Sequence, residues 1–120
     1  MAKTIMVVDD SAVIRQTVGI ALKQAGYEVI EANDGSDGLS KISGQKVNLI
    51  ISDVNMPNMD GISMVEALKK DPANKFTPVI MLITESQDAM KAKGKAAGVR
   101  AWVVKPFQPP QMLDAVAKLI

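Results

Sequence analysis

Short apolar runs alternate along the chain with segments in which apolar residues recur every three or four positions. The runs predict strands at about residues 4–8, 27–31, 47–52, 78–83 and 101–104. The other segments predict helices at about residues 11–25, 36–42, 61–70, 86–97 and 109–119. Strands that alternate with helices indicate right-handed crossovers and a parallel sheet with helices on both faces. The nearly continuous apolar character of the strands favours this arrangement over an antiparallel sheet, so the pattern predicts an α/β fold.

Composition narrows the class of protein further. The 120 residues suit one domain spanning 1–120, with a formal net charge of +1. So small a charge predicts no attraction to nucleic acid or to a membrane surface. No apolar run approaches the roughly 20 residues that span a bilayer, and the N-terminus lacks the pattern of a signal peptide. With no cysteine in the chain, we expect a cytoplasmic protein.

The absence of histidine bears on chemistry, because it removes the commonest general base and the commonest transition-metal ligand. Carboxylates, lysines, hydroxyls and backbone amides must therefore carry any reaction. Ligands of open α/β sheets bind outside the carboxyl ends of the strands. Polar residues follow four of the five predicted strands at this end: Asp9 and Asp10, Asp53, Thr84 and Glu85, and Lys105.

Each of these residues also has an ordinary structural interpretation. Asp9 and Asp10 could cap the first helix, Asp53 could be a loop acid, and Lys105 could be a surface lysine. Their joint placement at successive strand ends favours a shared site instead. Three converging carboxylates need a cation, and oxygen ligands suit Mg²⁺. A lysine beside a metal and a carboxylate nucleophile supplies the positioning and charge neutralisation that phosphoryl transfer requires.

At this point the chain resembles the receiver domains of bacterial two-component signalling, particularly the single-domain chemotaxis regulators. The resemblance covers the whole chain and rests on three motifs: Val7-Val8-Asp9-Asp10-Ser11, Asp53-Val54-Asn55-Met56-Pro57-Asn58-Met59-Asp60-Gly61, and Val104-Lys105-Pro106-Phe107. It implies a flavodoxin-like, doubly wound, five-stranded parallel sheet with strand order 2-1-3-4-5.

The resemblance also implies roles for individual residues. Asp9 and Asp10 would hold Mg²⁺ or Mn²⁺ together with Asp53 and the backbone carbonyl of Asn55. Asp53 would accept a phosphoryl group from the phosphohistidine of a sensor histidine kinase, and Lys105 would contact that group. The bond between Lys105 and Pro106 would be cis. Asn55 and Glu85 lie where this family places residues that affect access of the attacking water.

The switch residues depart from the usual pattern. Receiver domains usually carry Ser or Thr at the end of the fourth strand, coupled to an aromatic residue on the fifth, here Trp102. A register without gaps places Ile83 at the hydroxyl position and Thr84 one residue later. Because side chains on a strand alternate between faces, Thr84 would need a local bulge to reach the site. We favour the alternative, that the hydroxyl is missing. Trp102 could also be an ordinary core or half-buried aromatic.

The output is expected to be a protein contact. No effector domain is expected after the last helix, and we expect a monomer that assists only its own phosphorylation and dephosphorylation. In the family, the fourth helix, last strand and last helix form the partner surface. The fourth helix here carries Lys91, Lys93 and Lys95, which could also be a merely solvated face. The partner could be the flagellar motor switch or a kinase in a phosphorelay.

Three other interpretations remain open at this point. A flavodoxin on the same fold would need hydroxyls and amides, in place of Asp9 and Asp10, to hold a phosphate. A phosphatase of the haloacid dehalogenase type would place its nucleophile after the first strand, with a second Asp two residues on. A degenerate receiver domain acting as a scaffold or phosphate sink is consistent with Ile83, although Asp9, Asp10, Asp53 and Lys105 argue against it.

Overall fold

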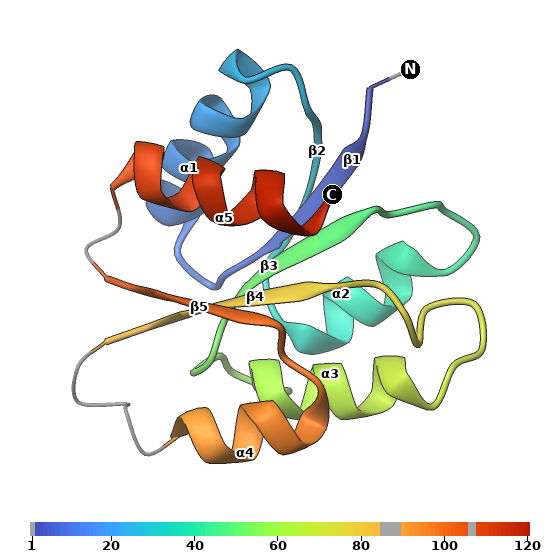
Figure 1. Cartoon of the computed structure of the whole chain (residues 1–120). Coiled ribbons are helices and arrows are strands. Elements are labelled where there is room, and N and C mark those ends of the chain that lie inside the picture. The colour runs from blue at the N-terminus through green and yellow to red at the C-terminus, as the bar shows by residue number, and fades with distance from the viewer. Residues whose placement is uncertain (1, 85–89, 106–107) are drawn as a thin grey trace.

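The computed structural model describes residues 2–84, 90–105 and 108–120 (Figure 1). The strands are β1 (Thr4–Val8), β2 (Glu28–Ala32), β3 (Leu49–Asp53), β4 (Val79–Ile83) and β5 (Ala101–Val104). The helices are α1 (Ala12–Gln24), α2 (Gly35–Ile42), α3 (Gly61–Lys69), α4 (Met90–Ala97) and α5 (Pro109–Leu119). All strand pairs are parallel, in the order β2-β1-β3-β4-β5. The predicted fold class and strand order are therefore confirmed.

Two apolar layers enclose the sheet because successive strand residues point to opposite faces. Alternate residues of the strands, such as Ile5, Val7 and Leu82, pack with buried residues of α1 and α5. The intervening residues, such as Met6, Met81 and Ile83, pack with α3 and with apolar residues of α2 and α4. Figure 1 shows α1 and α5 together on one side of the sheet and α2, α3 and α4 on the other.

Polar side chains set the starts of three helices, close to where the sequence predicts them. Ser11, Asp34 and Asp60 lie at the N-caps of α1, α2 and α3, and each side chain accepts a hydrogen bond from a backbone N–H three residues on. Gly26, just after α1, has a φ of 97°, a backbone conformation that glycine adopts at little cost. These local signals explain why helices alternate with strands so regularly.

The predicted boundaries differ in a few places. The apolar run begins at Val47, but β3 begins at Leu49, because Asn48 pairs with Thr4 through both its backbone N–H and its side-chain oxygen. The helix predicted over 86–97 is described from Met90 onward, and residues 85–89 lie outside the described part of the chain.

The start of β1 and the end of α5 lie close together at the amino edge of the sheet. The Lys3 ammonium group donates to the main-chain carbonyl of Ile120, at the end of α5. β1 and α5 therefore begin and end the fold at neighbouring points, on the edge opposite the carboxyl ends of the strands (Figure 1).

Candidate functional site

Asp9 and Asp10 follow β1, and the two acids have different environments. Asp9 is 1% exposed, and its Oδ1 accepts a hydrogen bond from Ser11 N at 2.9 Å. Arg15 Nη1 donates to the Asp9 carbonyl at 2.5 Å, and Arg15 Nε is 3.2 Å from a carboxylate oxygen of Glu31. Asp10 is exposed. Hydrogen bonds to the side chain and to the backbone carbonyl of Asp9 thus hold the chain after β1 in place. Asp9 is buried, whereas Asp10 faces solvent.

Asp53 is the last residue of β3 and is 8% exposed. Its Oδ1 accepts from Val54 N at 2.8 Å and lies 3.1 Å from Lys105 Nζ. Gly61, the first residue of α3, packs so closely that an added Cβ would lie 2.2 Å from the Asp53 carbonyl oxygen. The glycine therefore lets α3 start directly beside the strand end, and this contact helps to fix the backbone of Asp53.

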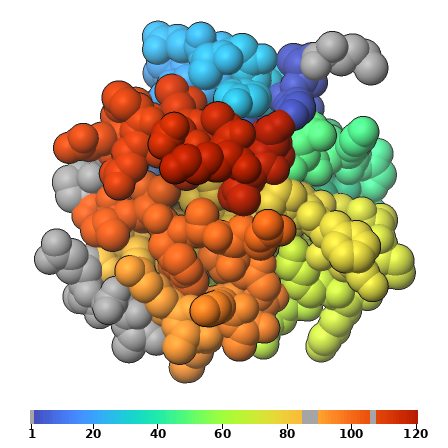
Figure 2. Space-filling model, viewed as in Figure 1, coloured from blue at the N-terminus to red at the C-terminus, as the bar shows by residue number. Residues whose placement is uncertain are grey.

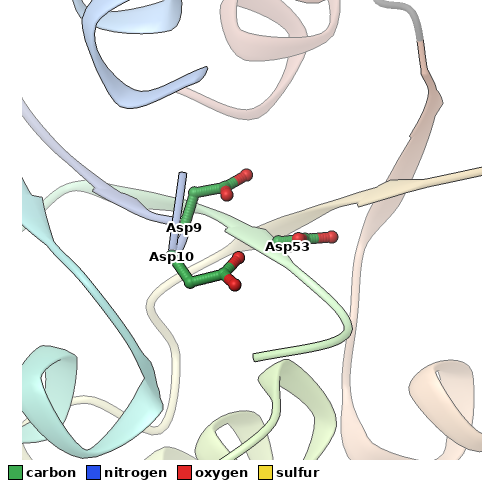
Figure 3. Close-up of side chains that lie close together, drawn as sticks. All are labelled: Asp9, Asp10 and Asp53. Carbon is green, nitrogen blue, oxygen red and sulfur yellow. The ribbon is translucent and has the colours of Figure 1, made fainter. Parts of the chain in front are cut away.

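The three carboxylates converge at the carboxyl edge of the sheet. Asp9, Asp10 and Asp53 each offer an oxygen within 4.8 Å of the others, and Figure 3 shows the three side chains directed toward the same region. Lys105 Nζ is 3.1 Å from Asp53 and 3.6 Å from Asp9 Oδ2. The sequence prediction that these four residues lie close together is confirmed.

The electrostatics of this cluster indicate a place for a cation. Asp9 Oδ2 is buried and has no hydrogen-bond partner among the described residues. Burial raises the pKa of Asp9, and the charge of Asp53 raises it further, although the Ser11 N–H and the Lys105 ammonium group oppose the rise. One lysine is too little positive charge for three carboxylates. An oxygen-rich cluster with a buried carboxylate oxygen that accepts no hydrogen bond fits a hard divalent cation such as Mg²⁺.

The end of β4 carries the residues expected to act as a switch. Ile83 is 1% exposed and packs in the layer formed with α2, α3 and α4. β4 pairs with β5 from Ile80 to Ile83 in consecutive register, so no extra residue shifts the strand before Thr84. Thr84 is half-buried just beyond the strand. Trp102 lies on the same side of the sheet as Ile83 and is half-buried against this layer.

Of the remaining predicted residues, the structure describes Asn55. Asn55 is exposed, two residues beyond Asp53. Glu85 and Pro106 lie outside the described residues, so the predicted cis bond at Lys105–Pro106 and the water-access role of Glu85 remain predictions.

Sequence reasoning missed two interactions that hold the loops around the site. Arg15 contacts the backbone of Asp9, and Asn58 Nδ2 donates to Asp34 Oδ2 at 2.8 Å. An asparagine in the loop after Asp53 and an acid in the Asn33-Asp34-Gly35 turn were visible in the sequence. Local sequence patterns do not predict contacts between residues 24 positions apart. The pairing of Asn58 with Asp34 therefore follows only from the tertiary structure.

Comparison with known proteins identifies the family. Residues 5–117 match the response regulator receiver domain. The chain belongs to this family. Protein PilG of Pseudomonas aeruginosa is 41% identical over 112 residues, which are 93% of this chain and 83% of PilG. The chemotaxis response regulator CheY4 of Vibrio cholerae superposes with a TM-score of 0.94 at 42% identity, over 100% of both chains.

Another receiver domain, from the sensor histidine kinase PA1611 of Pseudomonas aeruginosa, has a TM-score of 0.91. It is 21% identical, covers 99% of this chain and 98% of its own, and was solved with a magnesium ion coordinated in its active site cleft. Membership of the receiver domain family decides against the flavodoxin and haloacid dehalogenase interpretations. No helix in the described ranges has the length and apolar character needed to cross a membrane.

Proposed function

We propose that this receiver domain accepts a phosphoryl group on Asp53, beside a divalent cation held by Asp9, Asp10, Asp53 and the backbone carbonyl of Asn55. The observation that carries the proposal is the convergence of three carboxylates within 4.8 Å, with Lys105 Nζ 3.1 Å from Asp53 Oδ1. Receiver domain relatives support the proposal, and one of them holds magnesium in its active site cleft.

Residues of the chain have distinct roles in the proposed phosphoryl transfer. A carboxylate oxygen of Asp53 attacks phosphorus, the bond from phosphorus to the donor imidazole nitrogen breaks, and an acyl phosphate forms. The Val54 N–H and the Lys105 ammonium group hold Asp53 Oδ1, which orients the carboxylate. Lys105 is then adjacent to the transferred oxygens and offsets their charge. A bound Mg²⁺ or Mn²⁺ supplies further charge neutralisation when present.

Signalling partners follow from the same proposal. The phosphoryl donor is a sensor histidine kinase, and the output is a protein contact in chemotaxis, as the description of CheY4 suggests. Figure 2 shows α4, β5 and α5, orange to red, over much of one face of the molecule. We assign the partner surface to α4, β5 and α5 on this face, where Lys93 and Lys95 are exposed. Catalysis is limited to the domain's own phosphorylation and dephosphorylation, in the cytoplasm.

A second candidate function is a receiver domain that is phosphorylated but switches weakly, acting as a scaffold or phosphate sink. Buried Ile83 at the end of β4 favours it, because isoleucine offers no hydroxyl to a phosphoryl oxygen. The two candidates share the acceptor and differ in how strongly phosphorylation changes partner affinity.

Mass measurement after incubation with acetyl phosphate and magnesium tests the acceptor. We expect a single added phosphoryl group on the wild type and none on Asp53→Asn. Asp114→Asn is a matched control, because Asp114 lies on α5 with an exposed side chain paired to Lys118. Absence of phosphoryl addition to the wild type would overturn the proposal.

A further inference from the structure

The loop between β3 and α3, residues 54–60, is attached to the start of α2. We call this segment the acceptor loop. Asn58 Nδ2 donates to Asp34 Oδ2 at 2.8 Å, and Gly35 N donates to the Met59 carbonyl at 3.1 Å. These bonds join segments that are 24 residues apart in the sequence. The acceptor loop is therefore held against the start of α2.

The backbone of Asn58 is in an unusual conformation. Its φ of 67° is the one positive value among the non-glycine residues that the structure describes. Most residues avoid this left-handed region, whereas asparagine tolerates it better than most others. Residue 58 therefore supplies both a backbone that turns the loop and an amide that reaches Asp34.

Asp34 is itself firmly placed. It is 7% exposed, and its Oδ1 accepts from Asp37 N at 2.7 Å as the N-cap of α2. Its second oxygen is the one that Asn58 uses, so both carboxylate oxygens are engaged. The hydrogen bond from Asn58 and the bonds from backbone amides lower the pKa of Asp34. A charged, doubly hydrogen-bonded carboxylate is a rigid anchor for the loop.

Close packing reinforces this attachment. An added Cβ at Gly35 would lie 2.8 Å from Met59 Cγ and 2.8 Å from the Met59 carbonyl oxygen. At the other end of the loop, Gly61 N donates to the Val54 carbonyl at 2.8 Å. Hydrogen bonds therefore hold both ends of the acceptor loop. Asn55, whose backbone carbonyl is the proposed metal ligand, lies in the sequence between Val54, which bonds to Gly61, and Asn58, which bonds to Asp34.

We propose that the Asp34–Asn58 hydrogen bond is a positioning element for the metal site, which holds the Asn55 carbonyl beside Asp9 and Asp53. This inference rests on the proposed function, because it assigns a role toward the same cation. Residues that orient metal ligands commonly change affinity strongly when mutated, even though they do not touch the ion. Asp34 and Asn58 are accordingly positioning residues and not ligands.

The main test variant is Asn58→Gly, because glycine keeps the left-handed backbone while the amide is lost. Asp34→Asn keeps one oxygen for the helix cap, and its NH2 group can donate to the Asn58 side-chain oxygen once the Asn58 amide turns over, so it serves as the conservative variant. The chain offers a matched control at the opposite edge of the sheet, where Asn74 Nδ2 donates to Asp71 Oδ2 at 3.1 Å. Asn74→Gly removes the same kind of bond from a turn outside the proposed metal site.

Isothermal titration calorimetry with MgCl₂ measures the effect, and urea unfolding without metal measures stability for every variant. We expect Asn58→Gly to weaken Mg²⁺ binding about tenfold, the scale typical of groups that orient metal ligands. Asp34→Asn should remain within about twofold of the wild type, because a hydrogen bond of reversed direction still joins residues 34 and 58. Asn74→Gly should lower stability without changing the Mg²⁺ dissociation constant.

Three results would overturn the inference. If wild type binds Mg²⁺ and takes up phosphate from acetyl phosphate while Asn58→Gly binds Mg²⁺ equally well, the positioning role fails and the proposed function stands. If Asn74→Gly weakens Mg²⁺ binding as much as Asn58→Gly, the effect reflects general destabilisation. A wild type that neither binds Mg²⁺ nor accepts phosphate would overturn both the inference and the proposed function.

Discussion

The indole of Trp102 lies in the space that a side chain at Gly94 would need. A Cβ built on Gly94 would be 2.2 Å from Trp102 Cη2 and 2.6 Å from Cζ2. The glycine on α4 therefore allows the tryptophan of β5 to pack beneath the helix. Gly94 costs the helix roughly 1 kcal/mol relative to alanine, but the close contact with Trp102 explains its presence.

Gly94→Ala is expected to destabilise the protein, although alanine is the better helix former. Overpacking of a filled space costs roughly 1–3 kcal/mol, which matches or exceeds the gain in helix propensity. The indole must move, so its fluorescence emission should shift to the red. Trp102 is the single tryptophan, so the signal is unambiguous. Ala96→Gly on the same helix is the control, because it should lower stability without shifting the emission. An unshifted emission in Gly94→Ala would contradict this packing.

Asp9→Asn is expected to stabilise the metal-free protein at neutral pH. Ionised Asp9 is buried with an oxygen that accepts no hydrogen bond among the described residues, a situation that costs roughly 1–3 kcal/mol, and the charges of Asp53 and Asp10 add repulsion that Lys105 only partly offsets. The raised pKa of Asp9 means that its ionisation opposes folding, so stability should increase as pH falls through this raised pKa toward the ordinary value of 3.8. Urea unfolding with EDTA checks this, and the variant should lack the increase. Equal stability of both proteins at pH 7 would be evidence against the electrostatic argument.

The Asp9→Asn substitution should lower the affinity for Mg²⁺, although it raises the stability of the metal-free protein. We expect Asp9→Asn to weaken it at least about tenfold, because a charged ligand is lost. Calorimetry on the same samples then gives the two effects side by side. A variant that is both more stable and equally able to bind Mg²⁺ would place the ion away from Asp9.

Acid should weaken the attachment of the acceptor loop. The pKa of Asp34 is lowered, first by the hydrogen bond from Asn58, so ionised Asp34 stabilises the fold. This contribution is complete above the ordinary value of 3.8 and is lost as pH falls below it through the lowered pKa. Asp34→Asn should therefore lose less stability than the wild type in that window, as measured by thermal unfolding between pH 5 and about pH 2. Parallel curves would show that Asp34 does not titrate in this way.

Ile83→Thr is expected to strengthen the response to phosphorylation. A hydroxyl there can donate to a phosphoryl oxygen, and a hydrogen bond to a charged group contributes roughly 1.5–3 kcal/mol. The change in partner affinity, or in Trp102 emission, on treatment with acetyl phosphate measures the response. Ile83→Val is the matched control, because valine has nearly the shape of threonine without the hydroxyl. An identical response in both variants would argue that position 83 has no switching role.

The sequence carried enough information for the sheet and for the acid cluster, for a definite physical reason. Apolar runs mark β1 and β3 in the sequence. A parallel sheet brings the carboxyl ends of both strands to one edge, so Asp9 and Asp53 are expected to lie close together. The Gly94–Trp102 contact and the Asp34–Asn58 bond have no such marker. Each depends on the exact distance between elements that are far apart in the chain, which tertiary packing alone determines. The start of β3 at Leu49 is also determined by tertiary structure, since Asn48 pairs with Thr4 of the neighbouring strand.

The contact between Lys3 and Ile120 has a practical consequence for engineering. Because both ends of the fold lie at the amino edge of the sheet, a short peptide linker could join them, and new ends could be opened in an exposed connection elsewhere. Such a circular permutant would keep the carboxyl edge, and the acids on it, intact. A fluorescent reporter fused at either end would likewise sit away from Asp53, the proposed acceptor, and would leave that residue accessible to a phosphoryl donor.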